Sequence, residues 1–201
     1  MTIPDQNSSA RDALLRSAHE ELIEKGHASV SLRAVARRAG LSHAAPAHFF
    51  GDRAGMLTAV ATGGFLELGR TLAAAARDAS ASGQSALDCL GLAYVEFGLA
   101  QPALMDLMFR RSELVTDDPA FVAAQRAALG YLRDAVSDLV PADSEEWSLV
   151  SWAVVHGLVS LTREGVLTRV AETHATDPAG LARHLVAVYG AGLTAIAAQH
   201  T

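Results

Sequence analysis

Residues 31–57 contain two short stretches with helical periodicity, separated by the turn Gly40-Leu41-Ser42. In the first stretch, apolar residues at positions 32, 35, 36 and 39 recur at the spacing of one helix face. Gly40 can adopt the positive φ that ends such a helix at little steric cost, and Ser31 and Ser42 are suitable N-caps. A short helix, a tight turn and a second short helix form a helix-turn-helix. This unit constrains the fold more strongly than any other feature of the sequence.

The rest of the chain carries start and stop signals of helices and little that favours strands. Half of the residues are apolar but only 5% are aromatic, and prolines and glycines stand where helices begin and end. The signals predict an all-α protein of about nine helices, beginning near Ser9, Ser31, Ser42, Asp52, Ser85, Pro102, Asp118, Ser144 and Asp177. The pair Gly63-Gly64 weakens the fourth helix by about 1–2 kcal/mol and favours a bend or break there.

Charge divides the chain into two parts. Residues 1–60 carry seven Lys/Arg and six Asp/Glu, whereas residues 61–201 carry nine against sixteen. Within the first part, positions 31–53 hold four arginines and one acid, which is the footprint of a site for a phosphate backbone. A solvated helix face would show the same run of charge. We expect a helix-turn-helix domain over residues 1–53 and a larger helical bundle over residues 54–201.

The sequence does not favour a membrane protein, a metal site or an enzyme. The single cysteine, Cys89, cannot form an internal disulfide, and the first residues do not resemble a signal peptide. The uncharged interior stretch 147–162 is shorter than the ~20 residues of a membrane span. The histidines are scattered, and no phosphate-binding loop or nucleophile elbow occurs. We therefore expect a cytoplasmic protein with no membrane contact, no cofactor, no metal and no catalytic residues.

Three features of the amino-terminal part together resemble the TetR/AcrR family of transcriptional regulators. These are Gly40-Leu41-Ser42, the aromatic pair Phe49-Phe50 and the following Arg53, and the resemblance extends over roughly residues 9–60. It implies that the second helix of the helix-turn-helix enters the major groove of double-stranded DNA. The expected DNA-binding residues are Ser31, Arg33, Ser42, His43, Ala44, Ala45, His48 and Arg53. Among these, the resemblance assigns Ser31, Arg33 and Arg53 to phosphates.

Two expected helices, one over 144–164 and one from Asp177 almost to the C-terminus, are apolar nearly all round. Such helices need burial on two sides, which a second subunit can supply. We expect a homodimer interface that contains Val154, Gly157, Leu158, Leu161, Leu185, Tyr189, Leu193 and Ile196. The alternative is that both helices are central in a monomeric core. The family resemblance favours the homodimer, whose two-fold symmetry matches a palindromic operator.

Trp152-x-x-x-His156-Gly157 resembles the Trp-His-Gly signature of one subfamily of TetR C-terminal domains, and residues 101–109 add a second, shorter similarity. The resemblance implies a pocket for a small apolar or amphipathic ligand in the carboxy-terminal bundle. Its expected lining is Tyr94, Phe97, Met105, Met108, Phe109, Phe121, Trp152 and His156. Plain core packing accounts for the same residues.

The sequence therefore predicts a ligand-responsive transcriptional repressor that binds a palindromic operator as a homodimer. An alternative is a small-molecule-binding or interaction dimer whose DNA-reading helix has decayed. It is suggested by Ala47 and Phe49, which stand where many members of the family have Tyr and His.

Overall fold

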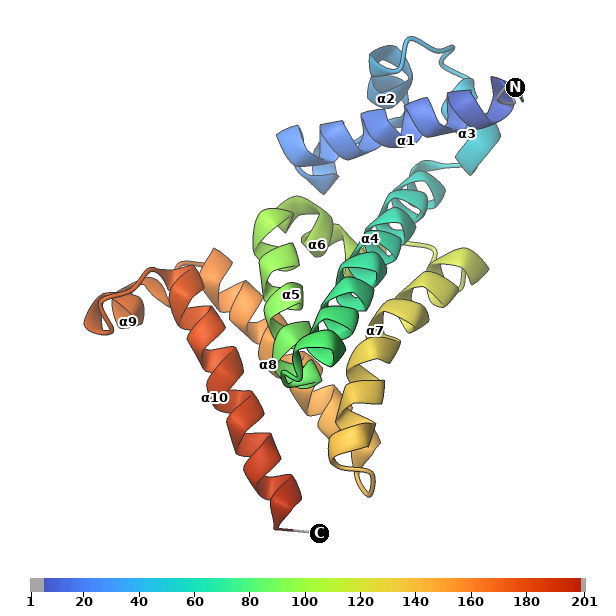
Figure 1. The fold of residues 1–201 in the computed structure, drawn as a ribbon. Coiled ribbons are helices and arrows are strands. Elements are labelled where there is room, and N and C mark those ends of the chain that lie inside the picture. The colour runs from blue at the N-terminus through green and yellow to red at the C-terminus, as the bar shows by residue number, and fades with distance from the viewer. Residues whose placement is uncertain (1–5, 200–201) are drawn as a thin grey trace. The chain divides into compact units, whose positions relative to one another are not determined.

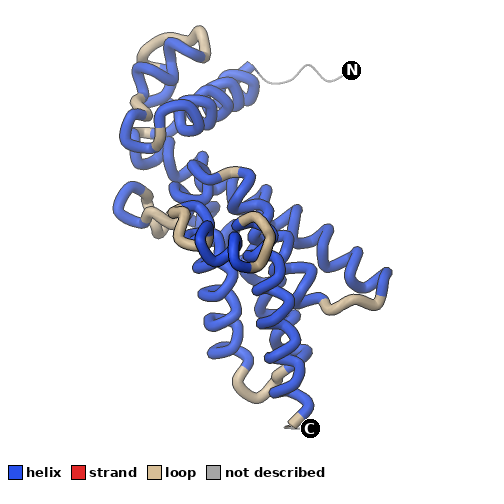
Figure 2. The backbone as a smooth tube through the Cα atoms, turned by 90° about the vertical axis from the view of Figure 1, so that its left-hand side faces the viewer, coloured by secondary structure: helices blue, strands red, loops and turns tan. Residues whose placement is uncertain are grey.

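The computed structural model describes residues 6–199, and within that range every regular element is a helix (Figures 1 and 2). The prediction of an all-α fold is confirmed. The elements are α1 Gln6–Lys25, η1 His27–Ser29, α2 Leu32–Arg38, α3 Ala45–Phe50, α4 Arg53–Ser82, α5 Ala86–Ala100, α6 Pro102–Met108, η2 Arg111–Glu113, α7 Pro119–Leu139, α8 Ser144–Arg163, α9 Thr168–Thr173 and α10 Pro178–Ala198, where η marks a short 3₁₀ helix.

Side-chain caps start several of these helices where the sequence predicts. Ser31 Oγ accepts a hydrogen bond from Ala34 N at 3.3 Å, and Ser85 Oγ accepts one from Asp88 N at 3.2 Å. The carboxylate of Asp177 accepts the backbone N–H of Gly180 at 2.7 Å. Each cap satisfies an N–H group that has no partner inside its own helix. The starts of α2, α5 and α10 are therefore fixed by local hydrogen bonding.

The structure differs from the prediction at two helix starts and in the number of helices. α1 begins at Gln6 rather than near Ser9. α3 begins at Ala45 rather than Ser42, because residues 42–44 form a turn in which Ser42 O accepts from Ala45 N at 3.0 Å. Pro46, at the start of the helix, needs no N–H partner there. The described range also holds ten α-helices rather than about nine. The additional helix is α9, which follows Gly165 and is anchored by the buried side chains of Leu167 and Ala171.

The glycine pair does not interrupt α4, which is continuous from Arg53 to Ser82. Gly63 is exposed and meets no neighbouring atom, whereas Gly64 lies against α6. A Cβ placed on Gly64 would be only 2.7 Å from Met108 Sδ. The missing side chain at Gly64 therefore allows α4 and α6 to approach closely, and this packing offsets the low helix propensity of glycine.

The chain forms two compact units that interleave in the sequence. The first contains residues up to 66 together with 103–125, and the second contains 67–102 together with the residues from 126 onward. The first part of α4 thus belongs to one unit and the second part to the other. The predicted boundary between a helix-turn-helix domain over 1–53 and a bundle over 54–201 does not coincide with these units and stays a prediction.

Each unit has its own core. In the first, Leu14, Leu22 and Val35 are fully buried where α1 packs on α2. Phe65 makes T-shaped contacts with Phe109 and Phe121, with ring centroids 5.4 and 5.5 Å apart. In the second unit, Leu87, Leu132, Val136 and Leu193 join α5, α7 and α10 in one cluster. The partly buried rings of Trp147, Trp152 and Tyr189 pack against that cluster.

Candidate nucleic-acid interface and ligand pocket

The turn between α2 and α3 has the geometry of a helix-turn-helix. Gly40 has φ of 67°, and Leu41 N donates to Ala36 O at 3.0 Å, which closes the end of α2. Val35 and Ala36 of α2 and Pro46 of α3 are buried between the helices. The arrangement leaves one side of the turn and of α3 facing solvent.

Most of the predicted DNA-binding residues lie on that exposed surface. Ser42, His43, Ala44 and His48 are exposed at the turn and along α3, while Ala45 is half-buried. Ser31 and Arg33 are exposed at the start of α2. The structure thus brings seven of the eight residues to one element pair, α2 and α3, with their connecting turn.

Arg38 is tied to α1 rather than open to solvent. Its guanidinium donates to Glu21 at 2.8 Å and to Glu20 at 3.4 Å, and it also pairs with Glu24. Hydrogen bonds from Lys25 and Arg38 lower the pKa of Glu21 against an opposing effect of burial. Arg38 therefore does not add a free positive charge to the basic run at 31–53. Arg33 and Arg37 are exposed and make no ion pair with any described residue.

Arg53, the eighth predicted residue, has three protein partners. Its Nε donates to Val30 O at 2.9 Å and its Nη2 donates to His27 O at 2.7 Å. Its Nη1 pairs with the carboxylate of Glu113 in η2, and this hydrogen bond lowers the pKa of Glu113. Arg53 thus fastens the start of α4 to the segment before α2 and to η2. No signal in the sequence indicates this contact, because 60 positions separate Arg53 from Glu113.

In the second unit, Tyr94, Trp152 and His156 form a hydrogen-bonded group. Trp152 Nε1 donates to Tyr94 Oη at 3.1 Å, and Tyr94 Oη lies 2.9 Å from His156 Nδ1. Burial raises the pKa of Tyr94, so its hydroxyl keeps its proton. Burial, together with the positive charge of Arg163, lowers the pKa of His156. A neutral imidazole can accept a hydrogen bond from the tyrosine hydroxyl at Nδ1, and the hydrogen bond from Trp152 Nε1 holds the indole in one orientation.

The residues predicted to line one pocket are divided between the two units. Met105, Met108, Phe109 and Phe121 belong to the first unit, in which both phenylalanines contact Phe65. The other four belong to the second unit: Tyr94, Phe97, Trp152 and His156. Within the second unit, Tyr94, Trp152 and His156 are in contact, as the sequence spacing of the last two predicts.

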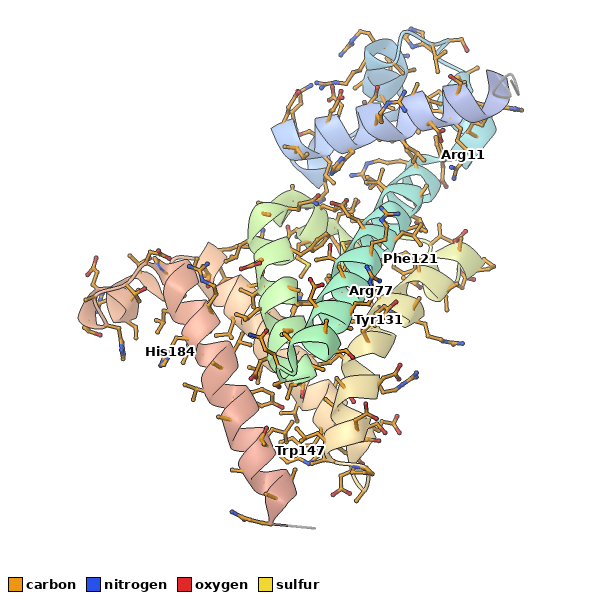
Figure 3. All side chains as sticks on the ribbon, in the orientation of Figure 1. Arg11, Arg77, Phe121, Tyr131, Trp147 and His184 are labelled. Carbon is orange, nitrogen blue, oxygen red and sulfur yellow. The ribbon has the colours of Figure 1, made fainter. Side chains whose placement is uncertain are left out.

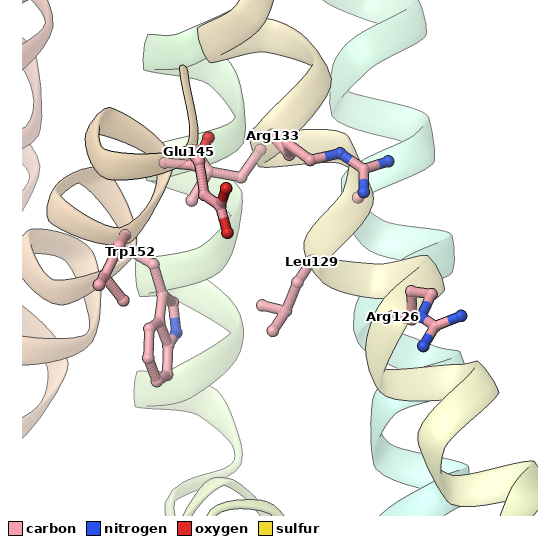
Figure 4. A pocket seen from close by; sticks show the side chains of 9 residues that line it. Arg126, Leu129, Arg133, Glu145 and Trp152 are labelled. Carbon is pink, nitrogen blue, oxygen red and sulfur yellow. The ribbon is translucent and has the colours of Figure 1, made fainter. Parts of the chain in front are cut away.

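A cavity of about 350 Å³ lies between α7 and α8 in the second unit (Figure 4). Its apolar lining includes Leu129, Leu132, Leu149 and Trp152. A narrow recess beside it shares Leu129, Leu132 and Trp152 and extends to Tyr94. The charged residues of the cavity are Arg126, Arg133 and Glu145. Of this lining, the sequence predicts Trp152 but none of the residues that α7 contributes, since nothing local distinguishes them from other helix positions.

The residues predicted for a dimer interface differ in exposure. Leu158 and Leu193 are buried within the chain, whereas Val154, Gly157, Leu185 and Tyr189 are half-buried. Leu161 and Ile196 are exposed.

Further apolar side chains are exposed on α8 and α10. These include Val150 and Val188, which are 43% and 53% exposed. His184 of α10 is also exposed (Figure 3). By length and composition alone, α10 could cross a membrane, but buried core helices meet the same criterion. The exposed apolar side chains of α8 and α10 form one candidate contact surface.

A helix-turn-helix with an exposed second helix, combined with a larger set of helices, defines the class of DNA-binding regulators to which the chain is similar. Residues 14–60 match the model for bacterial regulatory proteins of the tetR family, and residues 87–189 match the tetracyclin repressor-like C-terminal domain. The chain therefore belongs to the TetR family and is a DNA-binding transcriptional regulator. The prediction from the turn and aromatic pair is confirmed at the level of the family.

Solved structures agree with this assignment. A protein of unknown function from Rhodococcus sp. RHA1 is 30% identical, with a TM-score of 0.79 over 96% of this chain and 100% of that one. A TetR-family transcriptional regulator from Pectobacterium atrosepticum is 21% identical, with a TM-score of 0.68 over 96% and 97%. The multidrug binding protein EbrR, solved with imidazole, is 16% identical, with a TM-score of 0.53 over 92% and 94%. Comparison with curated proteins gives no match.

Proposed function

We propose that this regulator is a ligand-responsive repressor, located in the cytoplasm, that binds a palindromic operator as a homodimer. The observation that carries the proposal is the exposed surface formed by α3 and the preceding turn. The small side chains of Ser42 and Ala44 leave space for a close approach of the backbone to base edges, and His43 is exposed between them. Arg33 and Arg37 of α2 are the exposed, unpaired cations that would neutralise flanking phosphates.

The proposed dimer interface uses the exposed apolar side chains of α8 and α10. On α8, Val150, Val154, Gly157 and Leu161 recur at helical spacing. On α10, Leu185, Val188, Gly192 and Ile196 do the same. α8 and α10 contact each other within the chain, and we propose that the two rows form one surface. Two copies of this pair would form a four-helix interface, and its two-fold axis would place two reading helices on a symmetric site.

The proposed effector is a small apolar or amphipathic molecule bound in the cavity of the second unit. The volume of about 350 Å³ lies within the range of small-molecule sites. That EbrR was solved with imidazole shows that a small molecule can be held by a chain of this fold. α4 contributes residues to both units. We therefore propose that a movement of α4 transmits the binding of the effector to the DNA-binding helices.

Selection of bound sequences from random DNA tests the function directly. We expect a two-fold consensus, with half-sites about one helical turn apart. Arg33→Ala should weaken binding to the selected duplex. Because the dimer loses one phosphate contact in each subunit, the slope of log affinity against log salt should fall by about 1.8 in magnitude. Arg183→Ala is the matched control, because Arg183 is equally exposed but lies on α10. Tight ligand binding without any selected sequence would instead support the alternative of a decayed reading helix.

A further inference from the structure

The charged side chains that line the cavity point in different directions. In Figure 4 the carboxylate of Glu145 is directed into the space between α7 and α8, on the side of Trp152. The guanidinium groups of Arg126 and Arg133 point away from that space, and Arg133 lies 3.4 Å from Asp134. Glu145 forms no ion pair with any described residue. The charge presented to an occupant of the cavity is therefore negative.

The remaining lining suits the apolar body of an organic molecule. Leu129, Leu132 and Leu149 supply aliphatic surface, and Trp152 supplies an aromatic ring. The hydrogen bond from Trp152 Nε1 to Tyr94 Oη fixes the orientation of this ring before any ligand binds. An aromatic ring attracts a cation that lies over its face. Trp152 and Glu145 thus both favour a positively charged ligand.

We propose that the cavity between α7 and α8 binds an organic cation with an aromatic or apolar body, such as a protonated amine. The inference rests on the proposed ligand-responsive function and names the chemical class of the effector. The field of the whole second part of the chain has the matching sign, because residues 61–201 carry sixteen acids against nine bases. His156, held neutral beside Trp152, adds no opposing charge.

Glu145 also occupies the first turn of α8, where a carboxylate stabilises any helix. Glu146 provides the control for that role, since it is exposed in the same turn but does not line the cavity. Glu145→Gln and Glu146→Gln remove the same charge from the same helix end. Only the first removes it from the cavity.

The experiment measures by calorimetry how the full-length protein binds cinnamylammonium, cinnamyl alcohol and cinnamate, which share one carbon skeleton. We expect the cation to bind at least about tenfold more tightly than the anion. Glu145→Gln should reduce this preference to about twofold or less, whereas Glu146→Gln should leave it unchanged. Tighter binding of cinnamate, equal effects of the two variants, or no binding of the cation by the wild-type protein would each overturn the proposal.

The DNA-binding function is measured separately on the same variants. Without ligand, Glu145→Gln should bind the selected operator as the wild-type protein does, because Glu145 is remote in sequence from α2 and α3 and belongs to the other unit. Operator binding without any preference for the cation would overturn the ligand class and leave the regulator intact. Binding of the cation without a selectable operator would support the ligand class and contradict the proposed repressor function.

Discussion

At the scale of single residues, the environment decides what chemically identical side chains do. Arg33, Arg38 and Arg53 all lie in the basic run of the sequence, but of the three only Arg33 is exposed and makes no ion pair within residues 6–199. Arg38 is held by carboxylates of α1, and Arg53 by two carbonyls and Glu113. A positive charge with three protein partners has fewer donors left for a phosphate than one without any.

The salt dependence of DNA binding distinguishes these roles. Replacing a phosphate-binding arginine in both subunits of the proposed dimer removes two contacts and reduces the magnitude of the salt slope by about 1.8, whereas replacing a structural arginine does not change it. We expect Arg53→Ala to lower the thermal midpoint of unfolding and to leave the salt slope unchanged. We expect Arg33→Ala to reduce the salt slope and to leave the thermal midpoint unchanged. The measurement is fluorescence polarisation with the selected duplex over a salt series. A reduced slope for Arg53→Ala would show that Arg53 contacts a phosphate as the family resemblance implies.

Ser31 and Ser42, both predicted to bind DNA, differ in whether their side chains cap a helix. Ser31 caps α2, so Ser31→Ala should lower the free energy of unfolding by about 0.5–1 kcal/mol. Ser42 makes no cap at α3, so Ser42→Ala should leave that free energy unchanged within about 0.5 kcal/mol. Urea denaturation followed by circular dichroism measures both. Equal destabilisation by the two variants would contradict the structure of the turn.

His156 should make stability depend on pH. Its pKa in the folded chain lies below the ordinary 6.5, so the unfolded chain binds a proton that the folded chain resists. The contribution to stability is therefore complete above pH 6.5 and is lost as the pH falls through the lowered pKa. We expect the midpoint of urea denaturation to decline in this range for the wild-type protein and to decline less for His156→Gln. Parallel pH profiles of the two proteins would exclude this role of His156.

At the scale of elements, the adjacent glycines Gly63 and Gly64 of α4 should respond oppositely to substitution. Gly63→Ala adds a methyl group at an exposed helix position with no neighbour, which should stabilise the protein by about 0.5–1 kcal/mol. Gly64→Ala places the same group against Met108 and Leu104, which are buried and cannot move away freely. We expect a net loss of about 1–2 kcal/mol there. Thermal unfolding by calorimetry compares the pair, and stabilisation by both would mean that α4 and α6 are less closely packed.

At the scale of the whole molecule, the exposed apolar surface of α8 and α10 needs a partner. Val188→Asp introduces a charge in the centre of the proposed dimer interface, so we expect a shift from dimer to monomer in sedimentation velocity. The affinity for the palindromic operator should fall with it, because each monomer would then bind one half-site alone. Ile23→Asp is the control, since Ile23 is also exposed but lies on α1. A monomeric wild-type protein, or a dimeric Val188→Asp variant, would refute the proposed interface.

Local sequence patterns were sufficient to predict nine of the ten described α-helices, the turn and the family. The caps at Ser31, Ser85 and Asp177 and the positive φ at Gly40 depend on residues within about four positions, so local patterns reveal them. The exposed surface of α3 and the contact of Trp152 with His156 follow from helical spacing in the same way.

Only the tertiary structure decided which charges are free and which apolar faces are covered. The pairing of Arg53 with Glu113 and the closeness of Gly64 to Met108 join residues that are far apart in the sequence. Leu158 and Leu193 have the same helical pattern as their exposed neighbours, but packing within the chain buries them. The physical reason is that burial and ion pairing depend on distances in space, whereas helix periodicity and capping depend on distances along the chain.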